Sequence, residues 1–399
     1  WGQDFRFALI TDTHLNKDTL AYNDLKRTIN HINNTPGLSF VLVTGDLTEE
    51  GDWASLQKAK DLLDGLTIKY YATSGNHETK WSESGATDFE NIFGSDRFRF
   101  EYNGYVFLGF NTGPIIRMMD GHVAPQDIQW LEEEFSKAKK GTSFILVTHY
   151  PLKSGDVDNW YEVTDMARRY NVKAILGGHY HTNRLFFYDG IPAFINRSNL
   201  RDKEDKTGGY SVYEINKDSI IVYEQKLNKS PKKWGGYSLN EKYYSEDKSI
   251  YDRPSDSVNT IYPDVKEVWI NKIGNSIYSS PELYNNRVYT TDDAGQVTCL
   301  SMTDGKILWT FQSGKRIVGT PAAANGVIVF GSADKYIYGL DTEDGKLVWK
   351  YPAKEAVLGS VKIDGSTAYI GASDHTMRAI DIITGKLLWE YPHVKGYIE

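Results

Sequence analysis

The chain has 399 residues, of which 40% are hydrophobic and 25% are charged, and its formal net charge is −8. This length predicts two domains, and the absence of any apolar run near the roughly 18 residues of a membrane span predicts no span. The negative charge argues against a nucleic-acid polymer as the main partner, and the single cysteine, Cys299, excludes an intrachain disulfide and a thiolate metal cluster.

The sequence starts at Trp1 without a methionine. We interpret this start as a mature or trimmed N-terminus, consistent with an export signal that is not present in this chain.

Up to about residue 225, short apolar runs alternate with segments of helical periodicity. The runs are rich in Val, Ile, Leu, Tyr and Phe and cover 5–11, 40–45, 68–75, 105–111, 143–149 and 172–178. The helical candidates between them are 20–34, 52–65 and 124–140. This alternation predicts an α/β domain over residues 1–225, with a mostly parallel sheet covered by helices.

Five of the apolar runs end on residue types that bind metals. These residues are Asp12, His14, Asp46, Asn76, His77, His149, His179 and His181. Because parallel sheets gather functional groups at the carboxyl ends of their strands, we expect one shared site. Each fragment alone has an ordinary explanation, since strand-end histidines are often structural and Gly-Asp or Gly-Asn often forms only a turn. The ordered set of five favours a metal site.

The expected ligands are oxygen and imidazole, which suit Mn, Zn, Fe, Ni or Co. Such a set could hold two divalent ions about 3.5–4 Å apart if a carboxylate bridges them. A pair of this kind clamps a phosphate oxygen and supplies a bridging hydroxide that attacks phosphorus. The sequence therefore predicts hydrolysis of a small phosphate ester.

The motifs DTH, GD, GNHE, the histidine of THYP, and GHYH together resemble the calcineurin-like metallophosphoesterases, over residues 5 to about 225. The resemblance implies a first metal on Asp12, His14 and His181. It implies a second on Asn76, His149 and His179, with Asp46 as the catalytic bridge. His77 would be a catalytic, non-ligand imidazole that steadies transition-state charge or protonates the leaving oxygen.

Glu49 distinguishes this sequence from the purple acid phosphatases, which have a tyrosine at that position. A divalent pair is therefore favoured over a ferric-tyrosinate centre. The motif layout favours phosphodiesterase over phosphomonoesterase activity, although both classes share it. Further candidates for substrate contact are Arg117, His122, Arg184 and Arg197, and candidate loops over the site are 78–91, with Trp81, and 112–125, with Met118 and Met119.

Residues 226–262 are polar, rich in Lys, Ser and Tyr, and are predicted to form a linker. From 263 to 399 the sequence repeats: Trp269, Trp309, Trp349 and Trp389 are 40 residues apart, and the last three lie in near-copies such as GKILWTF and GKLVWKY. This period predicts a partial β-propeller of about three four-stranded blades. Since propellers usually have at least about four blades, we expect either a fragment of a longer chain, which we favour, or closure by association.

These repeats resemble pyrroloquinoline-quinone-type propellers. A quinoprotein dehydrogenase generally needs a full ring and commonly a vicinal disulfide, so we expect no pyrroloquinoline quinone and interpret the repeats as a scaffold that binds a protein partner. Propellers of this type are common in bacterial envelope proteins, which favours a periplasmic or cell-envelope location.

The leading hypothesis is thus a binuclear-metal phosphoesterase fused to a propeller. The alternative is a non-catalytic envelope protein with a structural metal site and a partner-binding propeller.

Overall fold

The computed structural model describes residues 4–115, 120–203 and 206–394. The chain divides into two compact units, Trp1–Ser82 with Ala86–Arg253 and Glu83–Gly85 with Pro254–Glu399. Each unit is described separately.

Two six-stranded sheets form the centre of the first unit. One has the strand order β12-β11-β10-β1-β2-β3, in which β1, β2 and β3 are parallel. Its strands are β1 Phe5–Ile10, β2 Leu38–Thr44, β3 Tyr70–Thr73, β10 Gly209–Ile215, β11 Ser219–Lys226 and β12 Lys232–Ser238.

The other sheet has the order β4-β5-β6-β7-β9-β8, with a parallel core of β5, β6, β7 and β9. Its strands are β4 Phe98–Tyr102, β5 Tyr105–Gly109, β6 Ser143–Val147, β7 Asn171–Gly177, β8 Arg184–Tyr188 and β9 Ile191–Ile195. The parallel strands expected for one sheet are thus divided between two, each with antiparallel strands at an edge.

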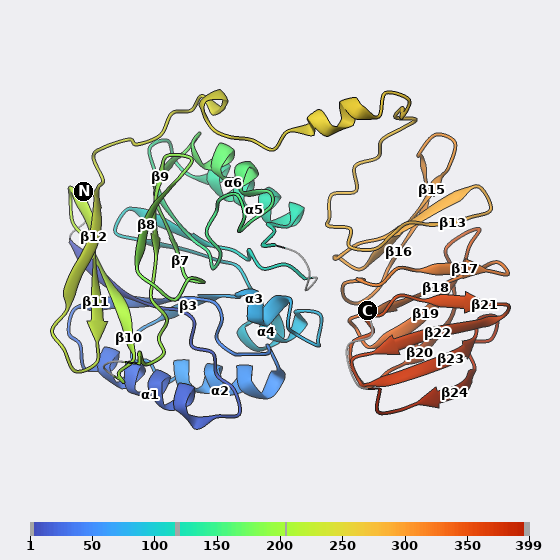
Figure 1. The fold of residues 1–399 in the computed structure, drawn as a ribbon, viewed down its shortest axis with the longest axis horizontal. Helices are drawn as coiled ribbons and strands as arrows, with labels where there is room; N and C mark the ends of the chain where they lie inside the picture. Colours follow the sequence, from blue (N-terminus) through green and yellow to red (C-terminus); the bar gives the residue numbers. More distant parts are fainter. Residues whose placement is uncertain (1–3, 116–119, 204–205, 395–399) are drawn as a thin grey trace. The chain divides into compact units, whose positions relative to one another are not determined.

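The helices of the first unit are α1 Thr19–Asn33, α2 Trp53–Leu63, α3 Asn76–Thr79, α4 Thr87–Phe93, α5 Pro125–Lys137 and α6 Trp160–Ala167. Figure 1 shows α1 and α2 along one side of the unit and α5 and α6 along the opposite side. Both long N-terminal helices begin at an aspartate cap: Asp18 accepts from the Leu20 N–H and Asp52 from the Ser55 N–H.

An aromatic core fills the space between the two sheets. Phe7 of β1 stacks on Phe40 of β2 at 4.9 Å between ring centroids and meets Phe107 of β5 edge-on at 5.7 Å. Separate apolar clusters join α1 and α2 to the first sheet and α5 and α6 to the second. The unit is therefore built of four layers, helix, sheet, sheet and helix, and the strands are fixed from both faces.

The segment 226–262, expected as a linker, contains β12, which pairs antiparallel with β11. Trp234 and Tyr237 of β12 pack against the core between the sheets, although the surrounding composition is polar. The 3₁₀ helices η1 Lys248–Ile250 and η2 Asp256–Ile261 follow. The predicted domain limits at 225 and 262 stay predictions, but this strand belongs to the first unit.

The described part of the second unit, up to residue 394, contains three sheets of four sequential antiparallel strands. They are β13 Glu282–Tyr284, β14 Arg287–Thr291, β15 Gln296–Ser301 and β16 Ile307–Gln312; β17 Ala322–Ala324, β18 Val327–Ser332, β19 Tyr336–Asp341 and β20 Leu347–Pro352; and β21 Lys362–Asp364, β22 Thr367–Ala372, β23 Thr376–Asp381 and β24 Leu387–Tyr391. We call these sheets blades 1, 2 and 3. The predicted fold class, an α/β domain with central sheets flanked by helices and an all-β region of about three four-stranded blades, is confirmed.

Among the described residues, no helix is both long enough and apolar enough to cross a bilayer.

Candidate metal centre

The eight predicted site residues all follow strands of the first unit, and the turns that carry them meet. Asp12 and His14 follow β1, Asp46 follows β2, Asn76 and His77 begin α3 after β3, His149 follows β6, and His179 and His181 follow β7. The Asp12 N–H donates to the Gly45 carbonyl at 3.0 Å, and the His14 N–H donates to the Asp46 carbonyl at 3.0 Å. The turns after strands of both sheets therefore contribute residues to one site.

The backbone of these turns is unusual. Five of the eight residues have positive φ: Asp12 at 53°, His14 at 46°, Asp46 at 50°, His179 at 73° and His181 at 57°. Side-chain-bearing residues rarely adopt this left-handed region, and such strain gathers at functional sites where the surrounding structure maintains it.

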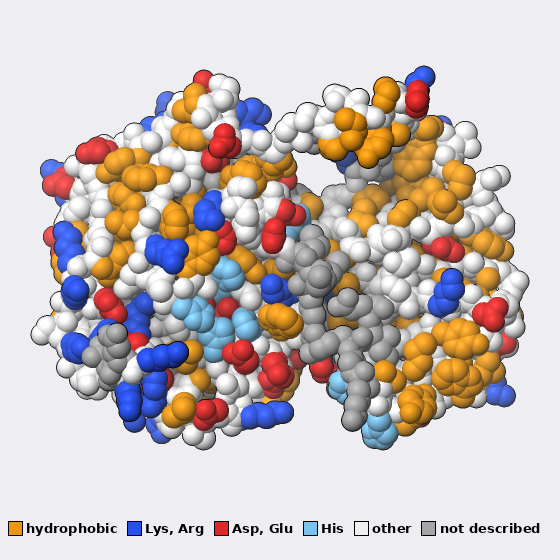
Figure 2. Space-filling model, viewed as in Figure 1, with side chains coloured by type: hydrophobic (Ala, Val, Ile, Leu, Met, Phe, Trp, Pro, Cys, Tyr) orange, Lys and Arg blue, Asp and Glu red, His pale blue; other side chains and the backbone are white. Residues whose placement is uncertain are grey.

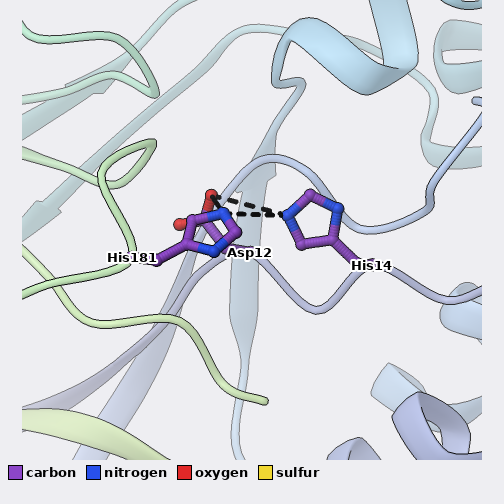
Figure 3. A group of neighbouring side chains, drawn as sticks. All are labelled: Asp12, His14 and His181. Atoms are coloured by element: carbon purple, nitrogen blue, oxygen red, sulfur yellow. Dashed lines mark hydrogen bonds and ion pairs between the residues drawn. The ribbon is translucent and has the colours of Figure 1, made fainter.

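Asp12, His14 and His181 form a first group of possible ligands (Figure 3). The Nε2 atoms of His14 and His181 lie 3.1 Å apart, and Nε2 of His181 lies 3.2 Å from Oδ1 of Asp12. Asp12 is fully buried, and its Oδ1 has no aligned hydrogen-bond partner among the described residues. A buried carboxylate oxygen facing two imidazole nitrogens is the environment that a bound cation would satisfy.

Asp46, His149 and His179 form a second group. Nε2 of His149 lies 3.1 Å from both Oδ2 of Asp46 and Oδ1 of Asn76. Nδ1 of His179 lies 3.1 Å from the same Asn76 oxygen. The amide oxygen of Asn76 thus points into this group as a fourth oxygen or nitrogen donor.

Asp46 is shared by two groups of possible ligands, because His14, Asp46 and His77 also form one. Oδ2 of Asp46 lies 3.9 Å from Nε2 of His14 and 3.8 Å from Nε2 of His77. This carboxylate is therefore the side chain that lies between the first and second groups.

Hydrogen bonds behind the imidazoles set which ring nitrogen faces the centre. Nδ1 of His149 donates to the Thr44 carbonyl at 2.7 Å, and Nδ1 of His77 donates to the Glu49 carbonyl at 2.5 Å. Nδ1 of His14 lies 3.1 Å from the Glu49 carboxylate. In all three residues Nε2 is left for the centre, as in protein metal sites, where the second ring nitrogen is held by an oxygen.

Charge coupling inside the centre is strong. Burial disfavours the Asp46 carboxylate, but the adjacent His149 charge outweighs burial and holds the pKa of Asp46 well below its usual range. Burial likewise opposes a charge on His149, yet Asp46 raises the pKa of His149 to about 9. Burial and the His149 charge together lower the pKa of His179 to about 4. Without metal, one proton is therefore held between His149 and Asp46.

The centre opens into a cleft of about 520 Å³. Figure 2 shows histidine side chains gathered on one face of the first unit. The wall beyond the possible ligands consists of the first turns of α1 and the segment after β9, and contains Leu20, Ala21, Asp24, Leu200 and Arg201. Arg201 is held by Asp24, which accepts from Nε at 2.9 Å and from Nη2 at 2.7 Å.

Of the predicted substrate contacts, the three that the structure describes, His122, Arg184 and Arg197, do not line this cleft. His122 bonds Asp158 at 2.8 Å, Arg197 bonds Glu224 at 3.1 Å, and Arg184 lies over the Tyr180 ring at 5.2 Å. The ring of Trp81 lies 6.3 Å from that of His77. Arg117, Met118 and Met119 lie outside the described residues.

Sequence reasoning gave no role to several residues that support the centre. Buried Glu78 accepts from the N–H groups of Thr48 and Gly75, both at 2.9 Å, and so ties the Asp46 turn to the Asn76 turn. The motif GNHE, which ends on Glu78, is the sequence feature that could have indicated this role. No sequence feature indicated the contact between Arg201 and Asp24, because these residues meet only when the segment after β9 folds beside α1.

Two family models match the chain. Residues 5–183 match the calcineurin-like phosphoesterases, and residues 256–396 match the family described as outer membrane protein assembly factor BamB. The two-part architecture expected from the motifs and repeats is therefore confirmed, with a calcineurin-like phosphoesterase domain followed by BamB-like repeats.

Curated relatives match the first part of the chain. A probable glycerophosphodiester phosphodiesterase of Arcobacter nitrofigilis is 29% identical over 43% of this chain and 70% of its own length. A 3′,5′-cyclic-nucleotide phosphodiesterase of a Nostoc species is 25% identical over 37% of this chain, and the chain spans 57% of that relative's length. Among solved structures, a dimetal phosphatase from Danio rerio is 13% identical, with a TM-score of 0.47, over 60% of this chain and 99% of its own.

Proposed function

We propose that the first unit is a binuclear-metal phosphoesterase that hydrolyses small phosphodiesters. Asp12, His14 and His181 would hold one divalent ion, Asn76, His149 and His179 the other, and Asp46 would bridge them. The observation that carries this proposal is the position of Asp46, which belongs to the group with His149 and His179 and to the group with His14 and His77. The donor set of carboxylate, amide and imidazole fits Mn, Zn, Fe or Ni.

Ions bound there would supply positive charge for the phosphate oxygens and acidity that produces hydroxide from water near neutral pH. Other residues of the chain orient the side chains that surround the ions. Thr44 and Glu49 fix the ring positions of His149, His77 and His14, and Asp46 lies between the ligand groups. His77 lines the cleft and turns Nε2 toward the centre, where it can hydrogen bond the developing charge or the leaving oxygen.

The charge of the cleft favours a diester over a monoester. Among the described lining residues, Arg201 is the one Lys or Arg side chain, and two of its nitrogens bond Asp24. Asp18 and Glu49 add negative charge to the same cleft. A diester carries one negative charge where a monoester carries close to two, so a diester depends less on cationic side chains beyond the two ions. Leu20, Ala21 and Leu200 provide a wall for the second ester group.

Two of the relatives support the same preference, since their names specify glycerophosphodiesters and 3′,5′-cyclic nucleotides. The BamB-like repeats would bind a protein partner, and they favour a periplasmic or cell-envelope location.

The test is hydrolysis of bis-p-nitrophenyl phosphate and p-nitrophenyl phosphate by protein stripped of metal and reloaded with Mn, Zn, Fe or Ni. We expect metal-dependent turnover that favours the diester and is lost in Asp46→Asn, while the circular dichroism of that variant is unchanged. Preference for the monoester would reject the diester assignment. If the protein binds ions but shows no turnover, the assignment as an enzyme is wrong and a non-catalytic scaffold is favoured.

A further inference from the structure

The turn after β7 carries two proposed ligands but encloses them only in part. His179 and His181 both have positive φ, at 73° and 57°, in the left-handed region that side-chain-bearing residues rarely adopt. The side chain of His181 is 45% exposed, whereas the other seven residues of the centre are buried or partly buried. Close packing therefore does not account for the position of His181, and specific contacts have to hold the turn.

Tyr180, between the two histidines, makes such a contact. Its hydroxyl donates to the Asp156 carboxylate and lies 2.8 Å from Oδ1 and 2.7 Å from Oδ2. The side chain of Asp156 is 9% exposed and also forms an ion pair with Lys153. The cationic groups of Lys153 and Arg184 lie 5.9 and 5.2 Å from the centroid of the Tyr180 ring. The side chain of Tyr180 is therefore held at both its hydroxyl and its ring.

Asp156 is presented by a loop that is itself fixed. The loop, residues 151–159, follows the proposed ligand His149. The Gly121 N–H donates to the Asp156 carbonyl at 2.8 Å. Val157 pairs with Gly121 in a β-bridge and is fully buried in the core beside α5 and α6. The Asp156 carboxylate is thus a fixed acceptor for the hydroxyl of Tyr180.

We propose that Tyr180 is a positioning residue for both metal sites, and that it acts through its hydrogen bonds to Asp156. The inference rests on the proposed function, because it takes His179 and His181 as ligands of different ions. These ligands are the two chain neighbours of Tyr180, so a shift of this one residue moves both imidazoles. The Asp156 carboxylate therefore holds the turn in the conformation in which each imidazole reaches its own ion.

The experiment is titration calorimetry of the metal-free full chain with Mn²⁺. Tyr180→Phe removes the hydroxyl and keeps the ring. We expect a loss of about tenfold in affinity at each of the two sites, because outer contacts of metal ligands contribute roughly 10–100-fold. Tyr70→Phe is the matched control, since Tyr70 of β3 donates to the Asp64 carboxylate at 2.8 Å and is not among the described residues that line the cleft. Its two affinities should equal those of the unaltered protein.

Variants of Asp156 separate positioning from folding. Asp156→Asn keeps an oxygen that can accept from Tyr180, so it should recover most of the affinity that Asp156→Ala loses. Tyr180→Phe combined with Asp156→Ala should lose no more than Asp156→Ala alone, because both changes remove the same contact. Circular dichroism checks that each variant is folded. Unchanged affinities in Tyr180→Phe, a loss confined to one site, or losses that add in the double variant would overturn the proposal.

Hydrolysis of bis-p-nitrophenyl phosphate distinguishes this proposal from the proposed function. If the unaltered protein binds two ions without turnover and Tyr180→Phe loses affinity at both sites, the phosphoesterase assignment is wrong and the positioning role holds. If turnover is present and Tyr180→Phe keeps both affinities, only the positioning role is wrong. An unaltered protein that binds no ion would overturn both.

Discussion

His149 and Asp46 define how the centre responds to pH. Because Asp46 raises the pKa of His149 to about 9, the metal-free protein carries a proton on this imidazole at neutral pH. A metal ligand must be deprotonated, so an ion has to displace that proton. The competition weakens as pH rises and ends once pH exceeds about 9.

We therefore expect the affinity for the ion at His149 to rise about tenfold per pH unit below that pKa, and then to level off. Binding at pH 7.5 should release a proton, which calorimetry in buffers of different ionisation enthalpy measures directly. Binding without proton release, or affinity that falls as pH rises from 7 to 9, would contradict this account of the pair.

Glu49 orients two imidazoles at once, His14 through its carboxylate at 3.1 Å and His77 through its carbonyl at 2.5 Å. Glu49→Ala removes only the first contact. Since such outer contacts typically contribute 10–100-fold to metal affinity, we expect a loss of about that size for the ion at Asp12, His14 and His181 alone.

Titration calorimetry of the two sites measures this loss. Glu50→Ala is the control, since Glu50 is the next residue in the chain and its side chain is exposed. Glu49→Gln should recover most of the affinity, because its amide oxygen can still accept from Nδ1. Equal affinities in Glu49→Ala and Glu50→Ala would show that the carboxylate contact is unimportant.

The sequence could predict which of the site's side chains meet, because all eight follow apolar strands. It could not predict Arg201 and Asp24, whose contact depends on the path of the chain after β9. Arg197, which the sequence offered as a candidate for substrate contact, is buried and bonded to Glu224.

Tight turns between the strands and the elements that follow them bring the proposed ligands together. Gly75 lies between β3 and α3, and a Cβ there would be 2.2 Å from Oδ1 and 2.4 Å from the backbone nitrogen of Asp46. The backbone cannot shift without moving the proposed bridge.

Gly75→Ala should therefore lower the free energy of unfolding by about 1–3 kcal/mol, as overpacking does, and should lower turnover further by displacing Asp46. Denaturant unfolding and diester hydrolysis measure the two effects. Gly65→Ala, in the loop after α2 where the nearest atom is 3.0 Å away, should have a smaller effect on stability and none on turnover. Full activity in Gly75→Ala would contradict this close approach.

The strand runs predicted from the sequence correspond to β1, β2, β3, β5, β6 and β7. Their division between two sheets was not predictable from periodicity, because a buried parallel strand has the same apolar pattern in either sheet. β12 was missed because Trp234 and Tyr237 lie among Lys, Ser and Gly, and packing against the core decides its conformation.

For the whole molecule, the 40-residue period predicted the blades because each repeat is one structural unit. All eight proposed site residues lie in the first unit, while residues 262–281 before blade 1 form no strand and are largely exposed.

Limited trypsin digestion should therefore cut at exposed Lys266 or Lys272, and the first unit should keep its metal content and turnover. Mass spectrometry locates the cut, and hydrolysis per bound ion measures the function. Loss of turnover that follows cleavage at these lysines would show that the second unit takes part in the chemistry.

Anomalous scattering from crystals of the intact chain loaded with Mn or Zn would locate the bound ions directly. A binuclear centre bridged by Asp46 should give two peaks about 3.5–4 Å apart, on either side of the Asp46 carboxylate. One would contact Asp12, His14 and His181, and the other Asn76, His149 and His179. A single peak, or two peaks that do not share Asp46, would contradict a binuclear phosphoesterase.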